Sequence, residues 1–337
     1  TSNCRMLYKR YGVPKVRMPN FFILLNHFVL FSSTKHLVCI HGEMHKMIQQ
    51  NEEIWHAQFG DAIPFIKHPT IRSAEACYIA TSQAIQLARR SNARLHIYHL
   101  TSGIETALFE NHLPVHEKKI TTEVCVQHLW FSDSDYERLG PLIKWNPSIK
   151  TPDDREALWV ALLDDRIDLI TSDHAPHTLA EKQRPYLQSL SGAPIIQHSL
   201  YLMMECYFQG KIPLEKIVEK MCHNPALVYG IEKRGFLREG YFADLIILNP
   251  AAPWTVAKSN LYSKCGWSPI EGQRFSSSIT HTFVNGVCVY KNGKFTGLKA
   301  GMPLLRNDTC SYFFHFLISI VIRLNLHLYY SYSNRTF

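Results

Sequence analysis

The nine cysteines of this 337-residue chain lie far apart, and no two of them form a C-x-x-C pair. Zinc ribbons, thioredoxin-type redox pairs and iron–sulfur clusters depend on closely spaced cysteines, so the spacing argues against all three. An odd number of widely separated thiols is typical of reduced, buried cysteines, which predicts a cytoplasmic protein.

Long runs of one charge and long apolar runs are also absent. The net charge is +8, but the chain has no long block of Lys and Arg, and no nucleic-acid partner is expected. Residues 21–31 and 312–322 are apolar but shorter than the ~20 residues that cross a bilayer, so no membrane span is expected. The first stretch resembles a signal-peptide core, although Asn26 and His27 favour a buried strand or helix. For the second, packing, peripheral anchoring and disorder remain open.

The composition suits a globular protein with a sizeable core, because 46% of the residues are hydrophobic and 19% are charged. Short apolar runs predict strands at residues 37–40, 94–100, 120–126 and 167–171. Helical spacing predicts helices at residues 72–91, 152–163 and 214–221. Strands that alternate with helices indicate βαβ units and a parallel α/β sheet, for which a barrel is one arrangement.

The character of the chain changes after about residue 235. Residues 240–248 and 280–290 have strand-like patterns, and Asn285-Gly286 and Asn292-Gly293 are strong turn signals. This part of the chain is therefore predicted to form a small all-β appendage.

One cluster of reactive side chains, the run from Thr171 to His177, directly follows a predicted strand. Catalytic groups collect at the C-terminal ends of parallel strands. Asp173 followed by His174 and His177 could bind a metal, relay protons, or both. A helix N-cap Asp beside polar loop histidines is the structural alternative.

Two further histidines end predicted strands: His41 follows residues 37–40, and His99 follows residues 95–98. A single strand-end histidine is more often structural, but three strand ends that each present a His or an Asp favour a hydrolytic zinc site at one barrel mouth. His96 should face the opposite side by strand alternation. Asn146-Pro147 suits either a substrate contact or a plain turn. The remaining histidines considered are expected to be surface or core residues: His45, His112, His116 and His128.

The run from Thr171 to His177, the following Glu181-Lys182 and residues 191–200 closely resemble the dihydroorotase family of the amidohydrolase superfamily. Segments that fit the same family are residues 223–226, 235–248, 264–269 and 280–286, so the resemblance covers about residues 37–306. Allantoinase and hydantoinase relatives share the Asp-His core but differ around residues 175–177.

The resemblance implies a (β/α)8 TIM-type barrel with a small β-sandwich appendage and a zinc centre. It also implies the reversible cyclisation of N-carbamoyl-L-aspartate to dihydroorotate in pyrimidine synthesis, with these small molecules as substrates. The residues that it implies as metal ligands are His41, His99 and Asp173, and Asp173 is also the expected catalytic acid and base. The residues that it implies for substrate binding are Asn146, His177, Ser191 and Gly192.

The chain departs from the family pattern near its beginning. The family's first barrel strand carries a His-x-His metal pair and then an Arg for the substrate carboxylate, whereas none of the 18 histidines here stands two residues from another. The family's bridging lysine has no counterpart in residues 21–31. One zinc ion is therefore expected, with a second metal bound weakly or not at all and with greatly reduced activity.

These patterns divide the chain into four predicted parts: an atypical segment at residues 1–36, a barrel incomplete at its N-terminus at 37–234, the β appendage at 235–306, and an atypical hydrophobic tail at 307–337. The predicted function is a dihydroorotase-like zinc hydrolase. The alternative is a non-catalytic homologue that keeps the fold and acts as a binding or assembly partner. Self-association into a homo-oligomer remains open.

Overall fold

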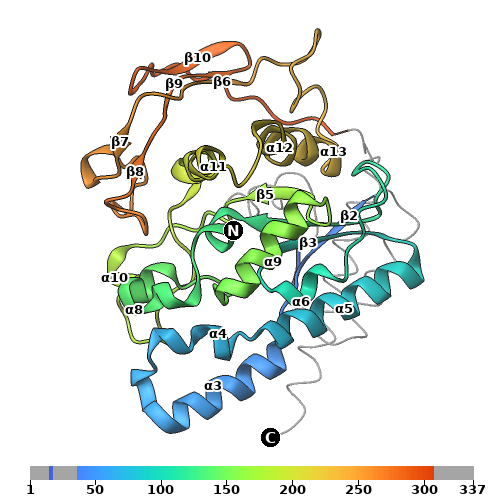
Figure 1. Ribbon diagram of the computed structural model, residues 1–337, viewed down its shortest axis with the longest axis vertical. Helices are drawn as coiled ribbons and strands as arrows, with labels where there is room; N and C mark the ends of the chain where they lie inside the picture. Colours follow the sequence, from blue (N-terminus) through green and yellow to red (C-terminus); the bar gives the residue numbers. More distant parts are fainter. Residues whose placement is uncertain (1–14, 18–35, 307–337) are drawn as a thin grey trace, which may run out of the picture.

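An all-parallel sheet lies at the centre of the computed structural model, which describes residues 15–17 and 36–306 (Figure 1). Its strands are β1 Lys15–Arg17, β2 Leu37–His41, β3 Arg94–Leu100, β4 Ile120–Cys125 and β5 Leu169–Thr171. Each strand lies beside its neighbour in sequence, as in a barrel, whereas the order of a doubly wound sheet reverses at a switch point. The predicted parallel sheet is confirmed, and the predictions for residues 21–31 and 312–322 lie outside the described residues.

The helices described before β5 are α3 His45–Phe59, α4 His68–Ile71, α5 Ala74–Ser91, α6 Gly103–Thr106, α7 Val126–Trp130, α8 Tyr136–Leu139 and α9 Pro152–Leu163. Of these, the sequence predicted only α5 and α9, and the long helix α3 was not predicted. Short 3₁₀ turns join them at Gly60–Ala62, Phe65–Lys67, Asp133–Asp135 and Gly140–Ile143. The predicted helix at 72–91 begins later, at Ala74, because the Ser73 hydroxyl accepts a hydrogen bond from the Ala76 amide and caps the helix.

The helices after β5 lead to the appendage. They are α10 Leu179–Lys182, α11 Ser199–Phe208, α12 Leu214–Val218 and α13 Asn224–Val228, with a π-helical segment at Glu219–His223 and 3₁₀ turns at Ile196–His198 and Lys258–Asn260. The predicted helix at 214–221 therefore changes its hydrogen-bonding pattern at Glu219. Within residues 15–17 and 36–306, no helix is both long and apolar enough to cross a membrane.

Several predicted strand boundaries need correction, and residues 280–290 form parts of two strands, β9 Ser278–Val284 and β10 Val287–Lys291. The strand predicted at 120–126 ends at Cys125 because Val126 begins α7. The strand predicted at 167–171 begins at Leu169, and the strand predicted at 240–248 is β6 Leu245–Asn249. In each case the predicted range extends beyond the strand into a turn, an irregular segment or a helix. Hydrophobicity alone therefore does not mark where a strand begins or ends.

The predicted β character after residue 235 is confirmed. An antiparallel sheet has the order β11 Lys294–Phe295, β10 Val287–Lys291, β9 Ser278–Val284 and β6, and a two-stranded sheet joins β7 Trp254–Thr255 to β8 Arg274–Phe275. Asn285 and Gly286 have φ angles of 51° and 80°, the left-handed pair that a tight hairpin between β9 and β10 requires. Figure 1 shows this appendage at one end of the molecule, next to α11.

Candidate functional site

Two predicted site residues meet where β2 and β3 end. His41 Nδ1 lies 2.8 Å from His99 Nε2, and the two rings meet edge to face with centroids 4.6 Å apart. Because the two strands are adjacent and parallel, their carboxyl ends deliver both imidazoles to the same edge of the sheet. His96 instead bonds Thr121 and Glu123 of β4, as strand alternation predicts.

The two facing imidazoles can be compared with the donor set of a zinc ion. Two nitrogens bound to one tetrahedral zinc stand about 3.3 Å apart, about half an ångström farther than His41 Nδ1 and His99 Nε2, which here share a hydrogen bond. Over the described residues, the structure brings no group of three or more His, Cys, Asp or Glu side chains close enough to hold a metal. The two imidazoles fit a zinc ion, and the third ligand, Asp173, stays a prediction.

Two of the predicted ligands have an unusual backbone conformation. His99 has a φ of 42° and Asp173 a φ of 41°, in the left-handed region that side chains with a Cβ seldom adopt. His99 is the penultimate residue of β3, and Asp173 lies two residues after the end of β5. Backbone strain of this kind is concentrated at functional sites, which agrees with the prediction that His99 and Asp173 are site residues.

Asp173 lies two residues after Thr171, which pairs with Cys125 at the end of β4. Burial raises the pKa of the Cys125 thiol, and the negative charge of Asp173 adds to that rise. Burial also lowers the pKa of His128 to about 4, while the charges of Asp173 and Glu43 oppose that shift. The carboxylates of Asp173 and Glu43 therefore both act on the pKa of His128, whose imidazole is buried in the core.

His128 connects β4 to the loop that carries Asn146. Its Nε2 donates to the carbonyl of Pro147 at 3.3 Å. Within the described part of the chain, neither the Nδ1 atom of His128 nor the buried Oδ1 atom of Asn146 has a hydrogen-bond partner. An unpaired buried acceptor is costly, and a ligand N–H can satisfy it.

The loop of Ser191 and Gly192 packs against the run that follows Asp173. His177 Nε2 donates to the carbonyl of Ser191 at 3.1 Å. Gly192 has a φ of 125°, and a Cβ at this position would lie 2.5 Å from the Cβ of Ala175, so only glycine allows this close approach. The structure thus brings together His177, Ser191 and Gly192, three of the four residues expected to bind substrate.

Two buried lysines hold this loop in place. Lys182 Nζ donates to the carbonyls of Lys144 and Leu190, and Lys144 Nζ donates to those of Tyr186 and Ser189. Burial lowers the pKa of Lys182 to about 7, and the charge of Lys144 adds to this shift. Burial likewise lowers the pKa of Lys144 to about 8, to which the charge of Arg72 adds.

The lysine pair predicts an unusual dependence of stability on pH. Lys182 titrates near 7 in the folded chain and near 10.5 when unfolded, so between these values the unfolded state binds more protons and stability rises with pH. One proton corresponds to about 1.36 kcal/mol per pH unit. From pH 7.5 to 9, the free energy of unfolding of the wild type should therefore rise by about 2 kcal/mol relative to Lys182→Met.

Urea unfolding of both proteins at the two pH values measures this difference. Lys211→Met, which removes an exposed lysine, is the control and should leave the pH dependence unchanged. If the free energy of unfolding changes equally with pH in the wild type and in Lys182→Met, the prediction is contradicted.

Sequence reasoning missed the residues behind His41. The Oε2 atom of Glu43 accepts hydrogen bonds from His41 Nε2, at 2.6 Å, and from Arg72. Burial by itself would raise the pKa of Glu43, but the nearby charges of Arg72 and His41 hold it well below its usual range. The available signal was an acidic residue two positions after a strand-end histidine.

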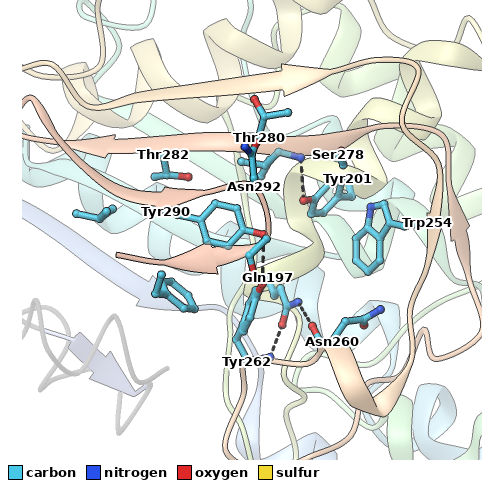
Figure 2. Close-up of a pocket in the computed structure, with 14 residues that line it drawn as sticks. Gln197, Tyr201, Trp254, Asn260, Tyr262, Ser278, Thr280, Thr282, Tyr290 and Asn292 are labelled. Atoms are coloured by element: carbon cyan, nitrogen blue, oxygen red, sulfur yellow. Dashed lines mark hydrogen bonds between the residues drawn. The ribbon is translucent and has the colours of Figure 1, made fainter. Parts of the chain in front are cut away.

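A cavity of about 530 Å³ lies elsewhere, between α11 and the appendage (Figure 2). Rings of Tyr201, Trp254, Tyr262 and Tyr290 line it. Gln197 closes one side, where its amide bonds the backbone of Asn260 and Tyr262. None of the predicted site residues lines this cavity, so we separate it from the strand-end site.

Comparison with known proteins identifies the family of this chain. The model of the amidohydrolase family matches residues 51–289. The dihydroorotase of Pyrococcus furiosus is 30% identical over 270 residues, which cover 80% of this chain and 58% of the relative. The dihydroorotase of Geobacter metallireducens is 34% identical over 212 residues, or 63% of this chain and 50% of the relative. The chain thus spans half to three fifths of the length of these relatives.

Solved structures share the fold. L-hydantoinase (dihydropyrimidinase) from Arthrobacter aurescens superimposes with a TM-score of 0.78 at 23% identity, covering 86% of this chain and 67% of the other. D-hydantoinase (dihydropyrimidinase) from Thermus sp. gives a TM-score of 0.81 at 16% identity, covering 91% and 69%. With its parallel α/β sheet and a family match over most of its length, the chain belongs to the amidohydrolase family.

Proposed function

We propose that this chain is a zinc-dependent cyclic amidohydrolase of the dihydroorotase type, which interconverts N-carbamoyl-L-aspartate and dihydroorotate. The observation that carries the proposal is the meeting of His41 Nδ1 and His99 Nε2 at the carboxyl ends of adjacent strands. Relatives at about 30% identity that are named dihydroorotase support this substrate over other cyclic amides.

In the proposed site, His41, His99 and Asp173 hold the metal. A zinc ion bound there would polarise the ring carbonyl and activate water for attack. Asp173 accepts a proton from the attacking water and passes it to the ring nitrogen. The water oxygen bonds to the carbonyl carbon and the ring C–N bond breaks. The products are a ureido NH2 group and a carboxylate, whose proton is released to solvent.

The remaining residues of the proposed site bind the substrate. The unpaired Oδ1 of Asn146 is an acceptor that suits the N–H groups of a cyclic amide. The ring of His177 is fixed by its bond to the Ser191 carbonyl, so it can face the substrate without losing its orientation. The Ser191–Gly192 loop supplies backbone groups beside it.

A zinc titration with parallel activity assays tests the proposal. The purified chain should retain about one zinc ion after dialysis, because three protein ligands and a water complete a catalytic zinc site. It should hydrolyse dihydroorotate slowly but faster than hydantoin or dihydrouracil. Faster hydrolysis of hydantoin would assign the chain to the hydantoinase type instead.

The non-catalytic alternative rests on the missing His-x-His pair. A chain that binds no zinc and hydrolyses none of the three compounds would favour that alternative. Two tightly bound zinc ions with rapid turnover would contradict the expectation of a weakened second site.

A further inference from the structure

The side of His41 that faces away from His99 is held by a buried carboxylate. Glu43 exposes only 2% of its side chain, and its Oε2 atom lies 2.6 Å from His41 Nε2. Arg72 donates to the same oxygen atom. This contact has no part in the chemistry proposed above, yet it touches one of the two imidazoles on which that chemistry depends.

The backbone brings this carboxylate behind the histidine through a tight turn. The amide of Glu43 donates to the carbonyl of His41 at 3.3 Å, directly after β2 ends. Gly42 allows the turn to pass close to α5, because a Cβ there would lie 2.7 Å from Thr81 Oγ1. The sequence His-Gly-Glu is therefore suited to return an acidic side chain to its own histidine.

Arg72 donates to Glu43 Oε2, and His41 Nε2 lies 2.6 Å from the same oxygen atom, so this oxygen is the acceptor and His41 Nε2 the donor. With Nε2 as the donor, the ring atom that can accept a bond or bind a metal is Nδ1, which faces His99. We propose that Glu43 is a positioning residue that fixes the orientation and the tautomer of His41, and that Arg72 holds Glu43 in place. The inference rests on the proposed function, since it assigns His41 Nδ1 to the metal.

Arg72 extends this arrangement to the substrate loop. Its backbone carbonyl accepts a hydrogen bond from Ser148 Oγ at 3.0 Å, two residues after Asn146. A continuous set of contacts thus runs from the Asn146 loop through Arg72 and Glu43 to His41. Partners of metal-binding histidines raise metal affinity by fixing the ring, and their loss typically costs 10–100-fold.

The same sheet contains a matched pair that lacks this arrangement. Glu123 Oε2 lies 3.1 Å from His96 Nε2, and both side chains are buried. The other ring nitrogen of His96 is bonded to Thr121 Oγ1 rather than facing a second imidazole. Glu123→Gln therefore removes a buried carboxylate from a histidine without touching the proposed metal pair.

Zinc affinity and ring tautomer together test the proposal. In Glu43→Gln, zinc affinity should fall 10–100-fold in competition with a chromogenic chelator, whereas Glu123→Gln should match the wild type. Histidine-selective ¹⁵N spectra of the metal-free chain should show His41 protonated at Nε2 in the wild type and a mixture of tautomers in Glu43→Gln. Arg72→Lys, which keeps one charged donor, should retain more affinity than Arg72→Met.

Unchanged zinc affinity and an unchanged His41 tautomer in Glu43→Gln would overturn the proposal. If Glu43→Gln does not fold, Arg72→Lys and Arg72→Met provide the same test. Identical His41 spectra and identical zinc affinities in these two variants would overturn the proposal. The tautomer measurement needs no metal and no activity. If the wild type binds no zinc, the proposed function fails, while the His41 spectra still decide whether Glu43 positions the ring.

Discussion

Replacement of His99 by alanine should lower the zinc affinity of the chain by more than about 100-fold. Structural zinc sites contribute about 10–16 kcal/mol over four ligands, or about 2.5–4 kcal/mol for each, and about 1.4 kcal/mol is a factor of ten. His99 Nε2 is one of the two nitrogen atoms that face each other at the strand ends. Competition with a chromogenic chelator measures the change.

The control for this experiment is His56→Ala on α3. His56 is half exposed and lies on a surface helix, so its loss reports non-specific zinc binding to surface imidazoles. We expect its affinity to equal that of the wild type. A His99→Ala protein within threefold of the wild type would remove His99 from the proposed metal site.

Replacement of Asp173 by asparagine should reduce the rate of dihydroorotate hydrolysis by about 10²–10⁴-fold, the usual contribution of a general acid and base. The amide of asparagine has nearly the same shape but cannot take a proton from water. Asparagine also tolerates the left-handed φ of 41° at this position, so the fold should be preserved. Single-turnover assays of the zinc-loaded chain are sensitive enough for a slow enzyme.

Asp165→Asn provides a matched control. Asp165 also has a positive φ, of 70°, and its carboxylate bonds Lys216 and Lys220, away from the strand-end histidines. Its replacement removes a charge from the same backbone conformation, and the hydrolysis rate should stay within about twofold of the wild type. A rate for Asp173→Asn above one third of the wild-type value would contradict the role of Asp173 as the acid and base.

The parallel sheet was predictable because its strands are short apolar runs separated by helical patterns. β2 and β3 begin at the predicted residues, and they pair in parallel as neighbours in the sheet. The ends of the strands were less predictable, as at Cys125 and Val126, where hydrophobicity continues although the backbone changes from strand to helix. The ends of the strands are set by backbone hydrogen bonding, which the residue pattern does not encode directly.

The facing pair of His41 and His99 was predictable for the same reason, since polar residues that end parallel strands gather at one edge. The residues that support the pair were not. Arg72 lies 29 positions after Glu43 in the sequence, and its contact depends on how α4 and α5 pack. The buried pair of Lys144 and Lys182 could not be predicted either, because both side chains bond backbone carbonyls and no acidic partner in the sequence indicates their burial.

The contact between Trp267 and His177 has a thermodynamic consequence. The indole of Trp267 donates to the carbonyl of His177 at 2.8 Å, and Trp267 and Phe275 belong to the same core cluster as Val38 of β2. Opening the appendage would therefore remove a donor from the loop beside Asp173 and expose part of the central core. Local unfolding of the appendage and loss of order at the strand-end site should therefore be one cooperative event. The amides of both regions should then exchange their hydrogens as a single unit.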